Sequence, residues 1–326
     1  MSAPTPLFTF RPIPTIAGML ESRGIAVIPL LDKAGLPHDA ITSTITAPLV
    51  RIQAFVDDVA EQLDAPLLGL DLVDLVPLGS YGVAEFAVHS APSIEVALSA
   101  LCELSPLLNP LNDMRYIADA SGCEIHFSYA GLRDSLGMQL NEYTIALIAR
   151  HFQGVLGKPL ALERAWFAHG RRERAEEVAR RLDCNVAFQK HDSGFALTSD
   201  VIAHRPANAN PALFDFLLTQ ARAQLANMGG TNIVAQTVRT IEARLAVKEV
   251  TASAIAEAMA TTERTLQRHL AEAGTSFRDV LTRVRLRRRA ELERADLTET
   301  EIATRLGFAN ARTMKGSLDT PPDDPT

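Results

Sequence analysis

A short segment near the end of the chain carries side chains of the types that read base pairs in double-stranded DNA. They are Arg264, Thr265, Gln267, Arg268 and His269. Arginine can donate two hydrogen bonds to guanine, and glutamine can bond adenine through two atoms, both in the major groove. Most helices also have a polar, solvated face, so these residue types alone favour DNA reading and an ordinary surface equally.

The apolar residues around this segment predict two short helices joined by a turn, which is the helix-turn-helix arrangement. The positions spaced to face inward are Ile255, Ala256, Met259, Leu266 and Leu270. Thr262 ends the turn, where its hydroxyl can cap the second helix. Because it precedes the residues named above, we also count Thr262 among the expected DNA-binding residues. A preceding helix is predicted by the apolar stripe Val234, Val238, Ile241 and Leu245.

Residues 302–318 repeat the pattern of residues 255–270, with one residue inserted in the turn. The repeated apolar positions are Ile302, Ala303, Leu306, Met314 and Leu318. Asn310 takes the capping place of Thr262. Because recurrence of one core pattern is hard to explain as a chance amphipathic sequence, the repeat favours DNA binding.

A charged helix is predicted between the two units. The pairs that fit capping boxes, at its start and at the start of the next helix, are Ser276/Asp279 and Thr298/Glu301. Five arginines fall between residues 285 and 294. Such a rigid connector could hold two recognition helices about 34 Å apart, the spacing of successive major grooves. Its arginines could contact phosphates or pair with Glu291 and Glu293, and the sequence leaves both open.

The charge is divided unevenly along the chain. The protein has 326 residues and a net charge of −7, yet residues 239–318 hold 15 Lys and Arg against 11 Asp and Glu. A basic module joined to an acidic partner domain is the asymmetry expected of a DNA-binding protein.

The compartment is predicted from features that the sequence lacks. No apolar run reaches the roughly 18–20 residues that span a bilayer, and the N-terminus has no secretory-signal pattern. The three cysteines are widely spaced, which suggests neither a disulfide framework nor a zinc site. We therefore expect a cytoplasmic protein with no membrane association.

A chain of this length predicts two domains. The patterns predict an α+β N-terminal domain followed by an all-α C-terminal domain with two helix-turn-helix units. The expected boundaries are a flexible tail (1–14), an α+β domain for effector sensing and dimerisation (15–200), a linker region (201–231), the double helix-turn-helix domain (232–318) and an acidic tail (319–326). The elements expected before the C-terminal domain are helices at 49–63, 92–108, 136–156, 173–182 and 211–228, a strand at 160–169, and hairpins at 115–130 and 186–197.

From Val234 to Leu318 the sequence resembles the AraC/XylS family of transcription regulators. The matching pieces are TTERTLQRHLAEAGTSFRDVL (261–281), VRLRRRAELE (284–293) and TETEIATRLGF (298–308). By position, the resemblance implies a first set of DNA contacts at Arg264, Gln267 and Arg268. It implies a second set at Arg312, Thr313 and Lys315.

The N-terminal part resembles the α+β sensor domain, of the arabinose-binding type, that accompanies one branch of this family. The matching pieces are LGLDL (68–72), YGVAEFAVHSAPSIEVALSAL (81–101), WFAHG (166–170) and LDCNVAF (182–188). The resemblance implies a small-molecule effector, whose identity it leaves open, together with a homodimer and contact with RNA polymerase.

Two places depart from the family pattern. Ala260 stands where the first turn usually has glycine, and alanine in a left-handed conformation costs of order 1 kcal/mol. Gly316 stands where the second recognition helix usually has arginine, and the acidic DTPPDDPT ends the chain in place of a final helix. We therefore expect the second unit to fold but to read DNA less well than the first.

The sequence gives no support to an enzyme. It contains no G-x-S-x-G, no H-E-x-x-H, no phosphate-binding glycine loop and no dinucleotide fingerprint. His169 and Cys184 could meet as a metal pair, but structural roles are favoured, so neither metal nor cofactor is expected.

The function predicted is a sequence-specific DNA-binding transcription regulator that acts on double-stranded promoter DNA and is controlled by an effector in the N-terminal domain. The alternative is an effector-binding or interaction protein with an impaired DNA module, which acts by heterodimerisation. Whether residues 231–326 shift DNA distinguishes the two.

Overall fold

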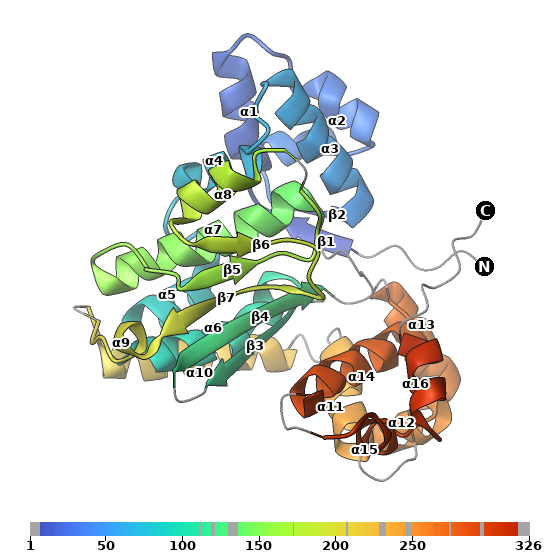
Figure 1. The fold of residues 1–326 in the computed structure, drawn as a ribbon. Coiled ribbons are helices and arrows are strands. Elements are labelled where there is room, and N and C mark those ends of the chain that lie inside the picture. Colours follow the sequence, from blue (N-terminus) through green and yellow to red (C-terminus); the bar gives the residue numbers. More distant parts are fainter. Residues whose placement is uncertain are drawn as a thin grey trace. The chain divides into compact units, whose positions relative to one another are not determined.

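The computed structural model describes residues 7–110, 112–118, 121–129, 136–171, 173–206, 208–227, 233–245, 250–273, 275–293 and 297–318. The chain divides into an N-terminal unit, Leu7–Asn227, and a C-terminal unit from residue 228 onward (Figure 1). The first combines sheets with helices and the second is helical. The predicted order of an α+β domain and an all-α domain is therefore confirmed.

A five-stranded sheet organises the N-terminal unit, with strand order β3-β4-β7-β5-β6 (Figure 1). The strands are β3 (Asn112–Ala118), β4 (Gly122–Tyr129), β5 (Arg164–Trp166), β6 (Asn185–Ala187) and β7 (Ser193–Thr198). Ile125, Phe127 and Tyr129 of β4 are buried, which is the period of two expected when one strand face meets the core. A second, two-stranded sheet pairs β1 (Leu7–Phe10) with β2 (Ile45–Pro48).

Helices cover the five-stranded sheet and pack on one another. Those that precede β3 are α1 (Ile13–Ser22), α2 (Ile28–Ala34), α3 (Leu49–Gln62), α4 (Leu68–Leu72), α5 (Gly82–Ser90) and α6 (Ile94–Leu108), with the 3-10 turns η1 (His38–Ile41) and η2 (Val73–Leu75). Those that follow β4 are α7 (Met138–Leu156), α8 (Ala175–Leu182), α9 (Ser199–Ile202) and α10 (Pro211–Asn227). Helix α6 contacts β3, α7 contacts β7, and α5 packs against both of these helices.

Most of the elements predicted for this unit are confirmed, within a few residues at their ends. Helices α3, α6, α7, α8 and α10 occupy the predicted helical ranges, and β3 and β4 form the first predicted hairpin. The apolar periodicity of these segments is long enough to identify them locally.

The second predicted hairpin, over residues 186–197, is wrong. Strand β6 pairs in parallel with β5, and β7 pairs with β4 and β5 instead. The segment β5-α8-β6 is a crossover unit, which places its two strands in parallel because the helix returns the chain to the same end of the sheet. The turn-forming residues 192–194 therefore lead from the sheet edge to its centre.

The boundaries of the N-terminal unit also differ from those predicted. From Leu7 onward the expected tail is ordered, because Phe8 and Phe10 are buried in β1. Helix α10, expected within the linker region, belongs to the N-terminal unit. It packs on α5 and α6 around the buried residues Ala84, Ala87, Leu104 and Ala221. The remaining tail (1–6), residues 228–231 of the linker and the acidic end (319–326) lie outside the described residues.

Six helices make up the described part of the C-terminal unit. They are α11 (Ile233–Leu245), α12 (Ala252–Ala258), α13 (Glu263–Glu272), α14 (Phe277–Glu293), α15 (Glu299–Arg305) and α16 (Ala311–Leu318). The stripe predicted for α11 is buried at Val234, Ile241 and Leu245, whereas Val238 is half-buried. Both predicted capping boxes are present, at Ser276/Asp279 and Thr298/Glu301.

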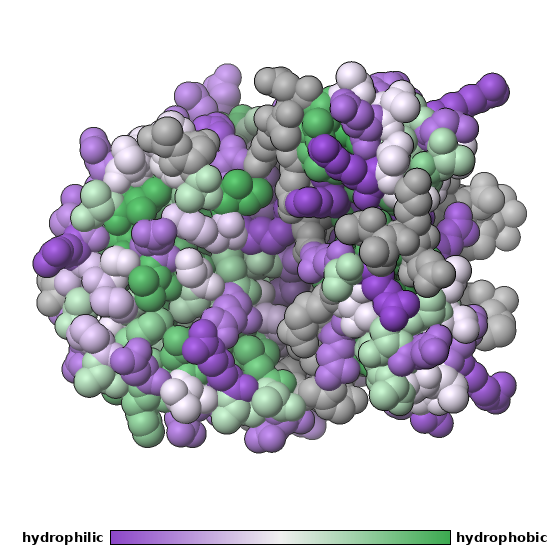
Figure 2. Space-filling model, turned by 90° about the horizontal axis from the view of Figure 1, so that it is seen from below, coloured by the Kyte–Doolittle hydropathy of each residue, from purple (hydrophilic) through white to green (hydrophobic). Residues whose placement is uncertain are grey.

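The surface mixes polar and apolar residues. On the face drawn in Figure 2, hydrophobic residues form separate spots interrupted by hydrophilic ones. The most exposed large apolar side chains in the described residues are Leu78 (65%) and Phe216 (60%). None of the described helices is both long enough and apolar enough to cross a membrane.

Candidate nucleic-acid interface and effector cavity

The first helix-turn-helix unit presents the predicted reading residues on one face of α13. Leu266 and Leu270, on the inner face of α13, are fully buried, and Ile255 and Ala256 of α12 are buried as well. The outward residues Arg264, Gln267 and Arg268 are exposed, whereas Thr265 and His269 are half-buried. The buried leucines thus fix the rotation of α13 about its axis and turn its basic face outward.

The start of α13 is fixed by the predicted cap. Thr262 Oγ1 accepts a hydrogen bond of 3.2 Å from the Thr265 amide and lies 2.9 Å from Thr265 Oγ1. Ser or Thr caps of this kind stabilise a helix by about 1 kcal/mol. Because Thr262 and Thr265 hydrogen-bond each other, we assign them to holding the helix start rather than to the centre of the reading face.

The contacts that the reading residues make within the protein are weak ones. Gln267 Nε2 donates to Glu263 Oε1 at 3.0 Å. Arg268 Nε lies 3.7 Å from Glu272 Oε1, and both side chains are more than 60% exposed. Exposed pairs of this kind contribute about 0–1 kcal/mol. Arg264 makes no hydrogen bond or ion pair with any described residue. All three side chains can therefore turn to a ligand at little cost.

The turn before α13 contains a strained residue. Ala260 has a φ of 51°, in the left-handed region that costs a residue with a Cβ roughly 1–2 kcal/mol. Ala260→Gly should therefore raise the free energy of unfolding of the C-terminal unit by about 1 kcal/mol, measured by urea denaturation followed by circular dichroism. The control is Ala258→Gly, two residues away in α12, which should lower it by about 0.5–1 kcal/mol. Equal effects of the two changes would contradict the assignment of strain to Ala260.

The second unit folds around its own core, as predicted. Its buried residues are Leu292, Ile302, Ala303, Leu306, Met314 and Leu318. Asn310 Oδ1 caps α16 by accepting a 2.8 Å hydrogen bond from the Thr313 amide. The residues Arg312, Thr313 and Lys315 are exposed, and Lys315 pairs with Glu299 of α15. Gly316 lies on the same helix with open space around its Cβ position.

Two arginines of the connector α14, Arg285 and Arg289, make contacts within the protein. Arg285 Nε donates to the Leu306 carbonyl at 3.1 Å, and its guanidinium lies 4.3 Å from the centre of the Phe308 ring. Burial lowers the pKa of Arg285. Arg289 pairs with Glu293 at 2.8 Å. Arg285 thus has a structural role, because it joins the connector to the end of α15. For Arg289, the ion pair with Glu293 favours pairing within the protein over contact with phosphate.

The N-terminal unit encloses a cavity of about 100 Å³ between α5, α6, α7 and the β1 segment. Its walls are mostly apolar, with residues such as Phe10, Leu104 and Phe152. Mostly apolar walls with a few polar groups are the usual features of a small-molecule site. No ligand-binding residue was predicted from the sequence, because the residues that line the cavity come from segments far apart in the chain.

A half-buried arginine and two tyrosines lie at this cavity. Arg11 stands over the ring of Tyr81 at 4.9 Å and donates to the Leu108 carbonyl. No described carboxylate forms an ion pair with Arg11, and burial lowers its pKa. The hydroxyls of Tyr81 and Tyr143 lie 2.7 Å apart, and burial raises the pKa of Tyr81 to about 12. The guanidinium is thus a charged group available to an anionic ligand.

Glu85, His89 and His151 form a second polar group on the same cavity. Glu85 Oε2 accepts from the Tyr81 amide at 2.9 Å, and Glu85 Oε1 lies 3.2 Å from His151 Nδ1. Burial lowers the pKa of His89, and the neighbouring His151 lowers it further. Sequence reasoning missed this group and expected no metal-ligating residues. The signal available was a Glu and a His four residues apart, in a segment for which no helix was predicted, and this spacing is too common to be singled out.

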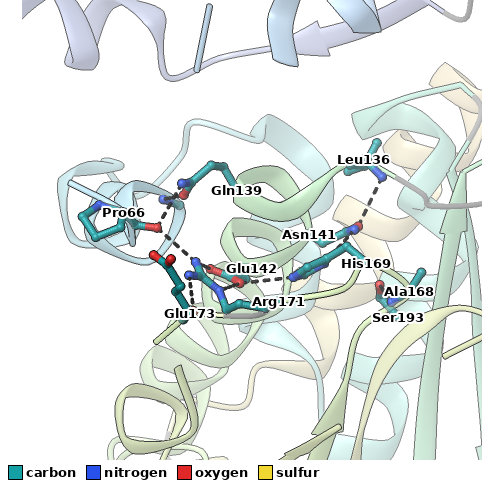
Figure 3. Close-up of polar contacts among 11 residues, drawn as sticks. Pro66, Leu136, Gln139, Asn141, Glu142, Ala168, His169, Arg171, Glu173 and Ser193 are labelled. Carbon is teal, nitrogen blue, oxygen red and sulfur yellow. Dashed lines mark hydrogen bonds and ion pairs between the residues drawn. The ribbon is translucent and has the colours of Figure 1, made fainter. Parts of the chain in front are cut away.

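The histidine considered as a metal ligand, His169, belongs to a buried polar network instead (Figure 3). Its Nε2 lies 3.2 Å from Glu142 Oε1, and its Nδ1 lies 3.2 Å from Asn141 Nδ2. Arg171 donates to both oxygens of Glu142, at 2.7 and 2.9 Å, and to the Pro66 carbonyl. The network joins α7 to the segments before α4 and after β5, so the motif WFAHG serves packing in this unit.

The fold and the exposed basic face of α13 define a helix-turn-helix protein with an additional α+β domain. Residues 24–205 match the arabinose-binding domain of AraC transcription regulators, N-terminal part, and residues 255–316 match a helix-turn-helix domain. The first match alone covers more than half of the chain. The chain belongs to the AraC family of transcription regulators.

Several known regulators are similar to the chain over most of its length. It is 24% identical to the ornithine utilization regulator of Pseudomonas aeruginosa over 257 residues, 77% of this chain and 74% of that protein. It is 23% identical to the HTH-type transcriptional regulator VirS of Mycobacterium tuberculosis over 308 residues, 92% of this chain and 89% of that protein. Among solved structures, the transcriptional regulator CdpR from Pseudomonas aeruginosa is 22% identical, covers 92% of this chain and 94% of its own, and gives a TM-score of 0.41.

Proposed function

We propose that this protein is a regulator that recognises promoter DNA mainly through α13, with Arg264, Gln267 and Arg268 at the bases. The observation that carries the proposal is the orientation of α13. Its apolar face is buried and its start is capped, so that these three long polar side chains stand exposed together. Arginine and glutamine are the types that discriminate guanine and adenine in the major groove. We infer a regulatory rather than a catalytic role, exercised in the cytoplasm.

We further propose that the cavity of the N-terminal unit holds the effector. Its apolar walls and the guanidinium of Arg11 suit a small molecule with a hydrophobic body and an anionic group. Membership of the family also supports a second copy of the chain and RNA polymerase as partners.

A selection experiment tests promoter recognition. The full-length protein is mixed with sheared genomic DNA of its own source, and bound fragments are sequenced at several salt concentrations. Enrichment of a few discrete sites is the expected result. Binding that is strongly salt-dependent and spread over all sequences would show phosphate contact alone. That outcome, or no binding, would favour the alternative of an impaired DNA module that acts through a partner.

The second unit should gain affinity when Gly316 is replaced with arginine. The position is exposed, its Cβ would meet no atom within 4 Å, and Lys315 and Arg312 stand on the same helix. One added charged contact should tighten binding to a selected site by about tenfold at low salt. Binding is measured by fluorescence anisotropy with the full-length protein.

The matched control is Gly316→Ala. Alanine removes the cost of glycine in a helix, about 1 kcal/mol, without adding charge. Equal gains for both variants would assign the effect to helix stability. No gain for Gly316→Arg would show that α16 does not approach the DNA.

A further inference from the structure

Three metal-ligating side chains converge on the cavity of the N-terminal unit. Glu85 and His89 are four residues apart on α5 and so share one face of that helix, and His151 reaches the same place from α7. One ligand atom from each residue lies within 4.8 Å of the other two. All three side chains line the cavity.

One atom of this group lacks the hydrogen bond that buried polar atoms normally make. Among the described residues, the buried His89 Nε2 has no hydrogen-bond partner. Glu85, whose side chain is only 2% exposed, is paired through Oε1 with His151 Nδ1 at 3.2 Å. Leaving a buried polar atom unpaired costs about 1–3 kcal/mol. His89 Nε2, beside a buried carboxylate and a second imidazole, therefore points to a ligand from outside the chain.

The packing around His89 holds its ring in this group. A Cβ at Gly154 of α7 would lie 2.9 Å from His89 Cε1, so a glycine leaves the space that the imidazole occupies. The rings of His89 and His151 meet edge to face, with their centres 5.7 Å apart. The two imidazoles are thus kept together although neither hydrogen-bonds the other.

We propose that Glu85, His89 and His151 form a binding site for a divalent transition-metal ion of the Zn²⁺ type. Two imidazoles and one carboxylate suit such an ion, whereas Mg²⁺ and Ca²⁺ prefer oxygen ligands throughout. Tetrahedral Zn²⁺ with bonds of about 2.0–2.2 Å holds its ligand atoms roughly 3.4 Å apart. The ligand atoms, which lie within 4.8 Å of one another, therefore need to approach by up to about 1.4 Å, which side-chain rotations can supply.

Three protein ligands leave a fourth position for water or another molecule. Because the three side chains line the cavity, a small molecule bound there can fill that position with a carboxylate, thiol or imidazole group. The inference that a cavity ligand coordinates the metal rests on the proposed role of the cavity in effector binding. The metal site itself stands on its own geometry.

The test uses full-length protein stripped of metal with a chelator and then dialysed against Zn²⁺. We expect one equivalent of Zn²⁺ to remain bound per chain and to raise the melting temperature. Replacing His89 with glutamine should weaken binding by at least about 100-fold, because even changes outside the ligand set weaken metal affinity about 10–100-fold. His89 is the residue to change, since it makes no hydrogen bond with a described residue and its loss leaves no new unpaired group.

Co²⁺ provides a second measurement. The visible absorption of bound Co²⁺ reports tetrahedral coordination, and we expect it in the wild type and not in His89→Gln. His38→Gln is the control, because this histidine is exposed and pairs with Asp32; it should leave stoichiometry and absorption unchanged.

Failure to retain Zn²⁺, or equal retention by wild type and His89→Gln, would overturn the proposal. Because the Zn²⁺ retention measurement contains no DNA, its failure is distinct from failure of the promoter selection.

Discussion

Replacing Arg171 with methionine is expected to lower the free energy of unfolding of the N-terminal unit by about 3–5 kcal/mol. The Arg171 side chain is 3% exposed and that of Glu142 is fully buried, with Arg171 Nε and Glu142 Oε1 2.7 Å apart. Methionine keeps much of the volume but leaves the carboxylate with His169 as its remaining side-chain contact, at 3.2 Å (Figure 3). A buried charge without its partner is the costly state.

Urea denaturation of the full-length protein measures this effect. The single tryptophan, Trp166, lies in β5 of the N-terminal unit, so its fluorescence follows the unfolding of that unit alone.

Arg181→Met is the matched control for Arg171→Met. Arg181 pairs with Asp71 at 2.8 Å, but both side chains are about 40% exposed. Exposed pairs contribute about 0–1 kcal/mol, so this variant should be nearly as stable as the wild type. Similar losses for the two variants would mean that burial of the Glu142 pair has no special effect.

The double variant Arg264→Ala/Arg268→Ala is expected to weaken binding to a selected promoter site by at least about 30-fold. Each bidentate contact to a base discriminates by about 1–3 kcal/mol, and about 1.4 kcal/mol corresponds to tenfold in affinity. The changes should not alter the fold, since both side chains are exposed and their partners within the protein are weak. Affinity for selected and random DNA is measured by anisotropy across a salt series.

Arg51→Ala/Arg180→Ala removes the same charge from exposed positions of the N-terminal unit. It should change site affinity by no more than a few-fold, through net charge alone. The Arg264/Arg268 variant should instead bind selected and random DNA alike. Equal weakening on both DNAs, with a shallower salt slope, would mean that these arginines contact phosphates rather than bases.

Local sequence patterns predict the C-terminal unit in detail. Its helices are amphipathic, and α12 to α16 each begin at a side-chain cap, so local rules identify them. Thr262 and Asn310 cap the recognition helices as predicted, and Ala260 adopts the left-handed conformation that its position in the pattern required. Exposure of Arg264 and Arg268 followed from the placement of Leu266 and Leu270 on the opposite face.

The cavity and its polar groups arise from long-range packing. Arg11, Tyr81 and Tyr143 come from three separate segments, and Glu85 and His89 meet His151 across two helices. The pairing of β6 with β5 and the attachment of α10 to the N-terminal unit are likewise long-range. Local periodicity reports which face of an element is buried but not which distant element covers it. For that reason the DNA-reading helix could be found from the sequence, while the cavity and the Glu85–His89–His151 group could not.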